Sequence, residues 1–185
     1  MSQPGPEDAT RAQEGSSLPR ESAAEVAGGT RADGATPGLV IVAGYGPVGR
    51  VVAERLERAG LKVTIIELNL NTIARQLALD KQVVYGDVAD PEVLERAGIR
   101  RAKALVLAVP NEACAVRACE VARRINGSLF ILARTSYVSQ GMLATRAGAD
   151  AVVIEEVVTA EAMQKLVVER LLGGREDATG DARTG

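Results

Sequence analysis

The sequence of 185 residues predicts an α/β fold, a parallel six-stranded sheet with helices on both faces in the doubly wound arrangement. Two observations predict it. Six short apolar runs alternate with segments whose apolar residues recur at helical spacing, and a glycine-rich loop joins the first run to the first helical segment. Right-handed crossovers between such strands give the expected strand order 3-2-1-4-5-6.

The predicted strands are short and mostly apolar because a parallel sheet is covered on both faces. The first, residues 39–43, contains no polar residue. The strands are expected, in order, at residues 39–43, 62–67, 82–85, 104–108, 129–133 and 151–154.

The first predicted helix follows the glycine-rich loop and covers residues 48–59. Gly60 stands just beyond its end, where glycine is favoured because it readily adopts a positive φ. The apolar side chains expected to share the side that faces the sheet are Val48, Val51, Val52, Leu56 and Ala59.

The other helices are predicted from capping residues and apolar spacing. Asn69 or Asn71 caps a short second helix that runs through Leu79. Asp90-Pro91 starts the third, because a cap is followed there by a first-turn proline. The third to sixth helices are expected at residues 91–97, 111–125, 138–147 and 159–172.

The two chain ends differ in composition from this core. Residues 1–37 and 173–185 hold few large apolar side chains, so burial cannot offset the entropy of ordering them, and both are predicted to be disordered. One ordered domain, residues 38–172, remains.

Composition argues against several classes of protein. The net charge of -2 lacks the basic excess of a nucleic-acid-binding protein, and no apolar run approaches the ~18 residues of a membrane-spanning helix. Cys114 and Cys119 fit a reduced setting and point to different sides of the predicted helix, so we expect two small buried side chains and no metal site. We therefore expect a cytoplasmic protein without nucleic acid or direct membrane insertion.

The glycine-rich loop Gly44-Tyr45-Gly46-Pro47-Val48-Gly49 has the spacing of a dinucleotide-binding turn between a strand and a helix. Gly44 permits the tight turn, Gly46 lets the backbone approach a pyrophosphate, and Gly49 lets the helix pack close to the sheet. Free N–H groups at the helix N-terminus favour phosphate groups. The pattern predicts a Rossmann-type fold that binds a dinucleotide.

Glu67 ends the second predicted strand, where a carboxylate accepts hydrogen bonds from ribose hydroxyls and repels a 2′-phosphate. We therefore predict NAD(H) rather than NADP as the ligand. The alternative is a cluster of turn glycines beside a solvated Glu67.

Other residues at the same edge of the sheet have more than one interpretation. Asp87 either accepts a hydrogen bond from an adenine amino group or caps the next turn. Val109-Pro110 lies at the switch point where ligands bind in this topology. Arg134 ends the fifth strand and either reaches a phosphate or ribose or forms an ion pair with Glu155 or Glu156.

A small NAD-dependent oxidoreductase is the alternative function. It would need a substrate pocket and a proton-transferring residue, but the nucleotide fold accounts for nearly all of the predicted domain. The chain contains no histidine, no Tyr-x-x-x-Lys pair and no Gly-x-Ser-x-Gly turn. We therefore predict no catalytic residue.

Six segments together indicate a family. They are residues 44–50 (Gly-Tyr-Gly-Pro-Val-Gly-Arg), 65–69, 84–91, 93–99, 131–134 and 148–152. In these segments the chain resembles the RCK N-terminal domain, also called KTN or TrkA-N, and most closely the cytosolic domain of Kef-type cation/proton antiporters. The resemblance covers roughly residues 38–172.

The resemblance implies a non-catalytic regulatory domain of potassium channels and transporters, which binds NAD(H), AMP or ATP and forms a homodimer. The implied partner is a membrane cation transporter or channel subunit. By motif match, the implied nucleotide contacts are Gly44, Tyr45, Gly46, Pro47, Val48 and Gly49 at the phosphates, Glu67 at the ribose with Leu68 next to it, Gly86, Asp87 and Val88 at the adenine, and Ala108 and Arg134 along the cleft.

The sequence also departs from the family pattern. It shows neither the membrane domain of Kef-type proteins nor the C-terminal RCK domain of many channel regulators, so we expect a separate subunit or a detached fragment, peripheral at the membrane through its partner. The last predicted helix has an apolar stripe that includes Met163 and Leu171. That stripe is expected either to cross to a partner subunit or to cover its own sheet.

Overall fold

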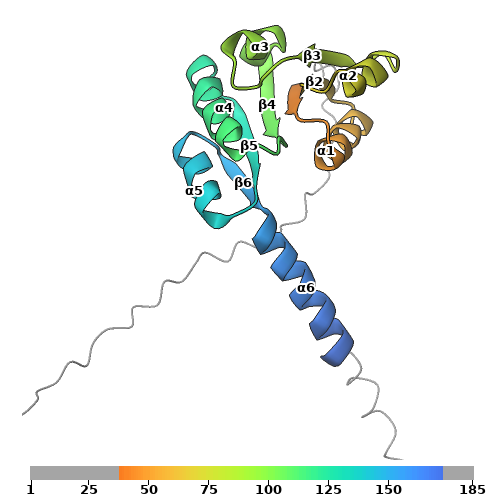
Figure 1. Cartoon of the computed structure of the whole chain (residues 1–185), viewed down its shortest axis with the longest axis vertical. Coiled ribbons are helices and arrows are strands. Elements are labelled where there is room, and N and C mark those ends of the chain that lie inside the picture. The colour runs from red at the N-terminus through yellow and green to blue at the C-terminus, as the bar shows by residue number, and fades with distance from the viewer. Residues whose placement is uncertain (1–37, 173–185) are drawn as a thin grey trace, which may run out of the picture. The chain divides into compact units, whose positions relative to one another are not determined.

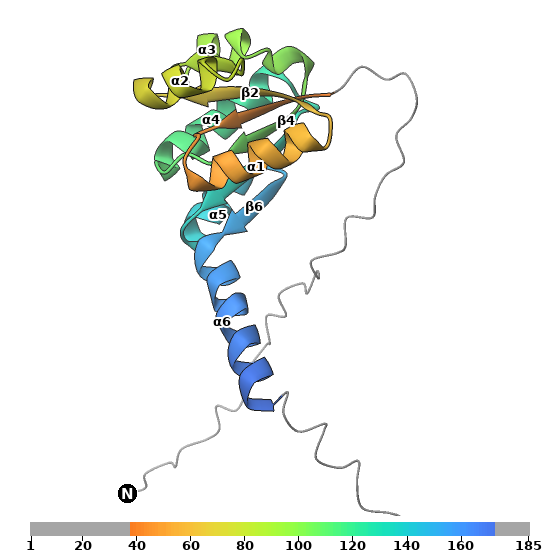
Figure 2. The ribbon, with the colours of Figure 1, turned by 90° about the vertical axis from the view of Figure 1, so that its right-hand side faces the viewer.

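The computed structural model describes residues 38–172, which form the α/β domain drawn in Figure 1. All strand pairs are parallel, and the sheet has the order β3-β2-β1-β4-β5-β6. Figures 1 and 2 show helices on both sides of this sheet. The predicted doubly wound, Rossmann-type fold and its strand order are therefore confirmed, whereas the ends predicted to be disordered lie outside the described residues.

The strands agree closely with the predicted ones. β4 begins at Ala102 rather than Ala104, and β5 ends at Thr135 rather than Ala133. The added residues include Lys103 in β4 and Arg134 in β5. A strand predicted from an unbroken apolar run stops at such a basic residue, so the predicted strands are too short at these ends. The observed bounds are β1 (Leu39–Ala43), β2 (Lys62–Glu67), β3 (Gln82–Tyr85), β4 (Ala102–Leu107), β5 (Phe130–Thr135) and β6 (Ala151–Ile154).

Side-chain caps mark the starts of the second and third helices. The side chain of Asn69, rather than that of Asn71, accepts hydrogen bonds at the start of α2, and Asp90 caps α3. The helix α6 begins directly after β6, earlier than the predicted Thr159. The observed bounds are α1 (Pro47–Arg58), α2 (Leu70–Leu77), α3 (Pro91–Arg96), η1 (Ile99–Arg101), α4 (Glu112–Ile125), α5 (Val138–Arg146) and α6 (Glu155–Leu172).

Alternate residues of β1 face two separate cores. Val40 and Val42 pack in one core with Ala53 of α1. Ile41 and Ala43 pack in the larger core, to which α3, α4 and α5 contribute. Helices thus cover both faces of the sheet, and the loops that follow the strands lie at its carboxyl edge.

The predicted sheet-facing side of α1 is only partly right, because Leu56 packs against the core there but the two valines of the first turns do not. Val48 and Val51 are 42% and 63% exposed, whereas Gly49 and Ala53 are buried. A Cβ atom on Gly49 would lie 1.8 Å from the carbonyl oxygen of Gly44, so the helix touches the glycine loop through this bare position. That contact sets the rotation of α1 and turns Gly49 and Ala53, instead of Val48 and Val51, toward the sheet.

The helix α6 has no buried residue, so it does not cover its own sheet. This excludes, for the described residues, one of the two arrangements expected from its apolar stripe. Figures 1 and 2 show it running away from β6. Phe130 of β5 and Val153 of β6 are correspondingly 47% and 42% exposed. Within residues 38–172, no helix combines the length and the apolar character that a bilayer crossing requires.

Candidate nucleotide site

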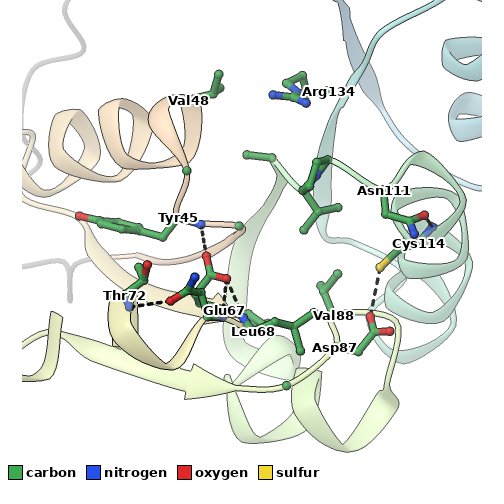
Figure 3. Close-up of a pocket in the computed structure, with 18 of the residues that line it drawn as sticks. Tyr45, Val48, Glu67, Leu68, Thr72, Asp87, Val88, Asn111, Cys114 and Arg134 are labelled. Carbon is green, nitrogen blue, oxygen red and sulfur yellow. Dashed lines mark hydrogen bonds between the residues drawn. The ribbon is translucent and has the colours of Figure 1, made fainter. Parts of the chain in front are cut away.

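A pocket of about 670 Å³ lies at the carboxyl edge of the sheet, as the predicted switch point requires. Its walls, shown in Figure 3, come from the loops after β1, β2, β3 and β4, from β5 and from α4. Gly49 is the one predicted site residue that does not line it. The predicted residues that line it are Gly44, Tyr45, Gly46, Pro47, Val48, Glu67, Leu68, Gly86, Asp87, Val88, Ala108 and Arg134.

The N-terminus of α1 opens into this pocket. Gly46 is the N-cap residue, Pro47 follows it, and the first helical hydrogen bond runs from the Arg50 N–H to the Gly46 carbonyl at 2.9 Å. Among the described residues, the N–H groups of Val48 and Gly49 meet no acceptor. Such free donors, together with the helix dipole, make this helix end a favourable place for an anion.

Two glycines keep the mouth of this site open. Nothing lies within 4 Å of the position that a Cβ on Gly46 would take. At Gly44, φ is +85° and a Cβ would meet the carbonyl carbon and oxygen of Ala108 at 2.9 Å. The loop after β1 therefore passes directly beside the end of β4, and its backbone stays uncovered toward the pocket.

The side chain of Tyr45 takes no part in this opening. It is buried in the core on the α1 side of the sheet, although its backbone lines the pocket. Burial raises the pKa of its hydroxyl; the charge of Lys81 partly offsets this rise, and that of Glu57 adds to it. Tyr45 thus contributes its backbone to the site and its ring to the core.

The Glu67 carboxylate lies in the pocket and accepts three backbone hydrogen bonds. Oε2 accepts from the N–H of Tyr45 at 2.7 Å, and Oε1 accepts from those of Leu68 and Asn69 at 2.7 and 2.9 Å. A carboxylate has about four lone-pair sites, so one remains for a ribose hydroxyl in this arrangement. Glu67 therefore also ties the loop after β1 to the loop after β2, a role that the sequence pattern did not indicate.

Asp87 performs the capping role that was one of its two interpretations. Its Oδ1 accepts from the N–H of Ala89 at 2.9 Å and from the thiol of Cys114 at 3.1 Å. The Ala89 N–H and then the Cys114 thiol lower the pKa of Asp87. Burial, followed by the hydrogen bond to Asp87, raises the pKa of Cys114 to about 11, so this thiol is protonated at neutral pH.

Arg134 stands across the opening of the pocket from Val48, as Figure 3 shows. Its Nη1 atom is 3.2 Å from Oε1 of Glu155, the first residue of α6. Of the two interpretations of Arg134, the ion pair is therefore present, and its partner is Glu155 rather than Glu156. A phosphate or ribose contact from the same side chain stays a prediction.

One face of α4 adds residues that the sequence analysis did not assign to the site. Asn111, the N-cap, is followed by Cys114 and Arg117, and all three line the pocket. Their spacing of three residues places them on one side of a helix, which is the signal that could have identified them. The burial predicted for Cys114 and Cys119 is confirmed. The described residues contain no group of three or more acidic, cysteine or histidine side chains that could hold a metal ion.

Comparisons with known proteins give the family. Residues 40–155 match the model of the TrkA-N domain. Potassium channel protein 1 of Methanocaldococcus jannaschii is 28% identical over 120 residues, which are 64% of this chain and 36% of that protein. The chain thus spans about a third of the length of this curated relative.

Two solved structures are similar in fold and in sequence. The TrkA-N domain of the inner membrane protein ybaL from Escherichia coli is 28% identical, with a TM-score of 0.69 over 71% of this chain and 98% of that one. The Kef CTD of Shewanella denitrificans in its AMP-bound form is 30% identical, with a TM-score of 0.60 over 75% of this chain and 92% of that one. The resemblance expected from the motifs is therefore confirmed, and the chain belongs to the TrkA-N domain family.

Proposed function

We propose that this chain is a regulatory nucleotide-binding domain of a potassium or other cation transport system. Its ligand is NAD(H), with AMP or ATP as the alternatives. The proposal rests mainly on one observation. The start of α1, where the N–H groups of Val48 and Gly49 meet no acceptor among the described residues, opens into a pocket lined by Val48 and by the carboxylate-bearing Glu67. The AMP-bound form of the similar Shewanella Kef CTD supports an adenine nucleotide.

The ligand would lie along the carboxyl edge of the sheet. Its phosphate would accept hydrogen bonds at the start of α1, and the ribose would lie beside Glu67. The adenine would lie between Leu68 and the loop that contains Asp87, and the other half of a dinucleotide would extend toward Ala108 and Arg134. The remaining lone pair of Glu67 suits a ribose hydroxyl and would repel a 2′-phosphate, which favours NAD(H) over NADP(H).

A role without catalysis is supported by the state of the ionisable groups that line the pocket. Glu67 and Asp87 already accept backbone hydrogen bonds, and the pKa of Cys114 is raised to about 11. A general acid or base works best with a pKa near the operating pH. These groups suit ligand binding and structural support better than proton transfer.

The helix α6 supports a homodimer. Its stripe of apolar side chains is exposed, and so are Phe130 and Val153 on the sheet. Exposed apolar side chains gathered on one element are typical of protein–protein contacts. We propose that α6 packs against a second copy of the chain, that the dimer acts at the cytoplasmic side of a membrane transporter or channel subunit, and that nucleotide binding changes the balance between two dimer arrangements.

A ligand panel tests the proposed function. The purified chain is titrated calorimetrically with adenosine, AMP, ATP, NAD, NADH and NADPH, and its thermal unfolding is followed. A ligand at 100 times its Kd should raise the free energy of unfolding by about 2.7 kcal/mol. We expect NADH to bind more tightly than NADPH, and adenosine, which has no phosphate, to bind weakly. Absence of any nucleotide effect would contradict the proposal, and turnover of NADH with small carbonyl compounds would favour the oxidoreductase.

A further inference from the structure

Arg134 connects the nucleotide pocket to the helix α6. It lines the pocket, and its guanidinium forms an ion pair with Glu155. The Nε atom of the same side chain is buried and has no hydrogen-bond partner among the described residues. The Arg134 guanidinium, which has one N–H group without an acceptor within residues 38–172, thus lies between the proposed phosphate site and Glu155, the first residue of α6.

The first turn of α6 is held by few contacts. Glu155 forms an ion pair with Arg134 and accepts a hydrogen bond from the hydroxyl of Ser136 at 3.5 Å. Glu156 accepts from the N–H of Val138 at 2.9 Å, and its own N–H donates to the carbonyl of Ser136 at 3.3 Å. No residue of α6 is buried, so these polar contacts are the main attachment of the helix to the β5–α5 loop.

We propose that a bound nucleotide phosphate and the Glu155 carboxylate compete for the guanidinium of Arg134. This inference rests on the nucleotide site proposed above. The side chains of Arg134 and Glu155 are 25% and 43% exposed, and an ion pair of that exposure contributes little net stability. Arginine forms strong, charge-assisted bonds to phosphate, and a phosphate near Arg134 also repels Glu155.

Competition has a consequence for α6. By linkage, if Glu155 weakens phosphate binding, then phosphate binding weakens the hold of Arg134 on Glu155 to the same extent. The bonds made by Glu156 remain, so the start of α6 loosens and pivots instead of detaching. Nucleotide occupancy would in this way reach the helix that is proposed to contact a second copy of the chain.

Charge-removing variants of the full chain test the competition. Glu155→Gln should bind AMP and NADH about fivefold more tightly than the parent, the lower end of ordinary coupling. Glu156→Gln removes an equal charge one residue away but keeps its acceptor for Val138, so it should bind as the parent does. In an Arg134→Met background, Glu155→Gln should tighten binding much less than in the parent, because only the direct repulsion between carboxylate and phosphate is left to remove. Affinities come from calorimetry.

Hydrogen exchange of the amides of residues 155–162 supplies a second readout. The parent should exchange faster in this segment when AMP or NADH is bound. Glu155→Gln should exchange faster without ligand and should not respond to it. If the parent binds nucleotide but Glu155→Gln binds equally well, the competition is wrong and the nucleotide site stands. If the parent binds neither AMP nor NADH, both proposals fail.

Discussion

Gly46 and Gly49 are close in the sequence but have opposite surroundings. A side chain at Gly46 would project into open space, whereas a Cβ at Gly49 would collide with the Gly44 carbonyl. We predict that Gly46→Val folds normally but does not bind AMP or NADH, because its side chain fills the place of the phosphate. Thermal unfolding and calorimetry measure the two properties.

The matched variant Gly49→Ala should mainly lower the stability of the fold, whereas Gly46→Val mainly abolishes nucleotide binding. Overpacking of this kind costs about 1–3 kcal/mol, so the variant should unfold at lower temperature whether or not ligand is present. If Gly46→Val bound NADH with the affinity of the parent, the assignment of the phosphate site to the start of α1 would be wrong.

Glu67 determines the expected preference for NADH over NADPH. Replacing it with Ala removes an acceptor for the ribose and the bond that fixes the N–H of Tyr45. A hydrogen bond to a charged group contributes about 1.5–3 kcal/mol, so we predict at least a tenfold loss of NADH affinity. NADPH should lose less, because the repulsion of its 2′-phosphate disappears. An unchanged ratio of the two affinities would contradict this role.

At this scale the sequence predicted the positions of the glycines and of Glu67, because their spacing follows from the turn itself. It did not predict the bonds that Glu67 makes to Tyr45, Leu68 and Asn69, since these depend on how two loops approach each other. Arg117 was missed for a similar reason. A basic residue on a helix is usually solvated, and its spacing of three residues from Asn111 and Cys114 points to the pocket only once the N-terminus of α4 is known to face it.

At the scale of elements, short apolar runs and caps located the strands and most helix starts. The rotation of α1 could not be predicted in this way, because apolar spacing gave weight to Val48 and Val51. The close approach of Gly49 to Gly44 decides the rotation instead, and it is a tertiary contact. Apolar spacing predicts the start of α6 too late, because Glu155 and Glu156 add no apolar residue to the helical pattern although they form the first turn of the helix.

The exposed stripe of α6 leads to a prediction about association. Leu166 and Leu171 are both exposed. The test uses the variants Leu166→Glu and Leu171→Glu. Charges at these positions should disfavour burial against a second chain and convert the proposed dimer to a monomer. Gln164→Glu adds the same charge at an exposed polar position of the helix and should leave the association unchanged.

Sedimentation velocity distinguishes these outcomes. A parent chain that sediments as a monomer at micromolar to millimolar concentration would contradict the homodimer. A parent dimer that withstands both leucine substitutions would place its interface outside α6.

At the scale of the whole molecule, the sheet places the loops after β1, β2, β3 and β4 around one pocket, and α6 leaves from the same carboxyl edge after β6. A ligand and a subunit contact can therefore influence each other over a short distance. The sequence predicted this architecture because strand alternation fixes the topology. It did not predict where α6 goes, because both a partner chain and the domain's own sheet suit an apolar stripe.

The most direct test of the central claim is an NMR titration of the ¹⁵N-labelled chain with AMP. We predict that the amide signals of Val48 and Gly49 show the largest shifts, since these N–H groups would donate to the phosphate. Adenosine should leave them nearly unchanged. AMP binding that shifts other amides and leaves those of Val48 and Gly49 in place would contradict the account.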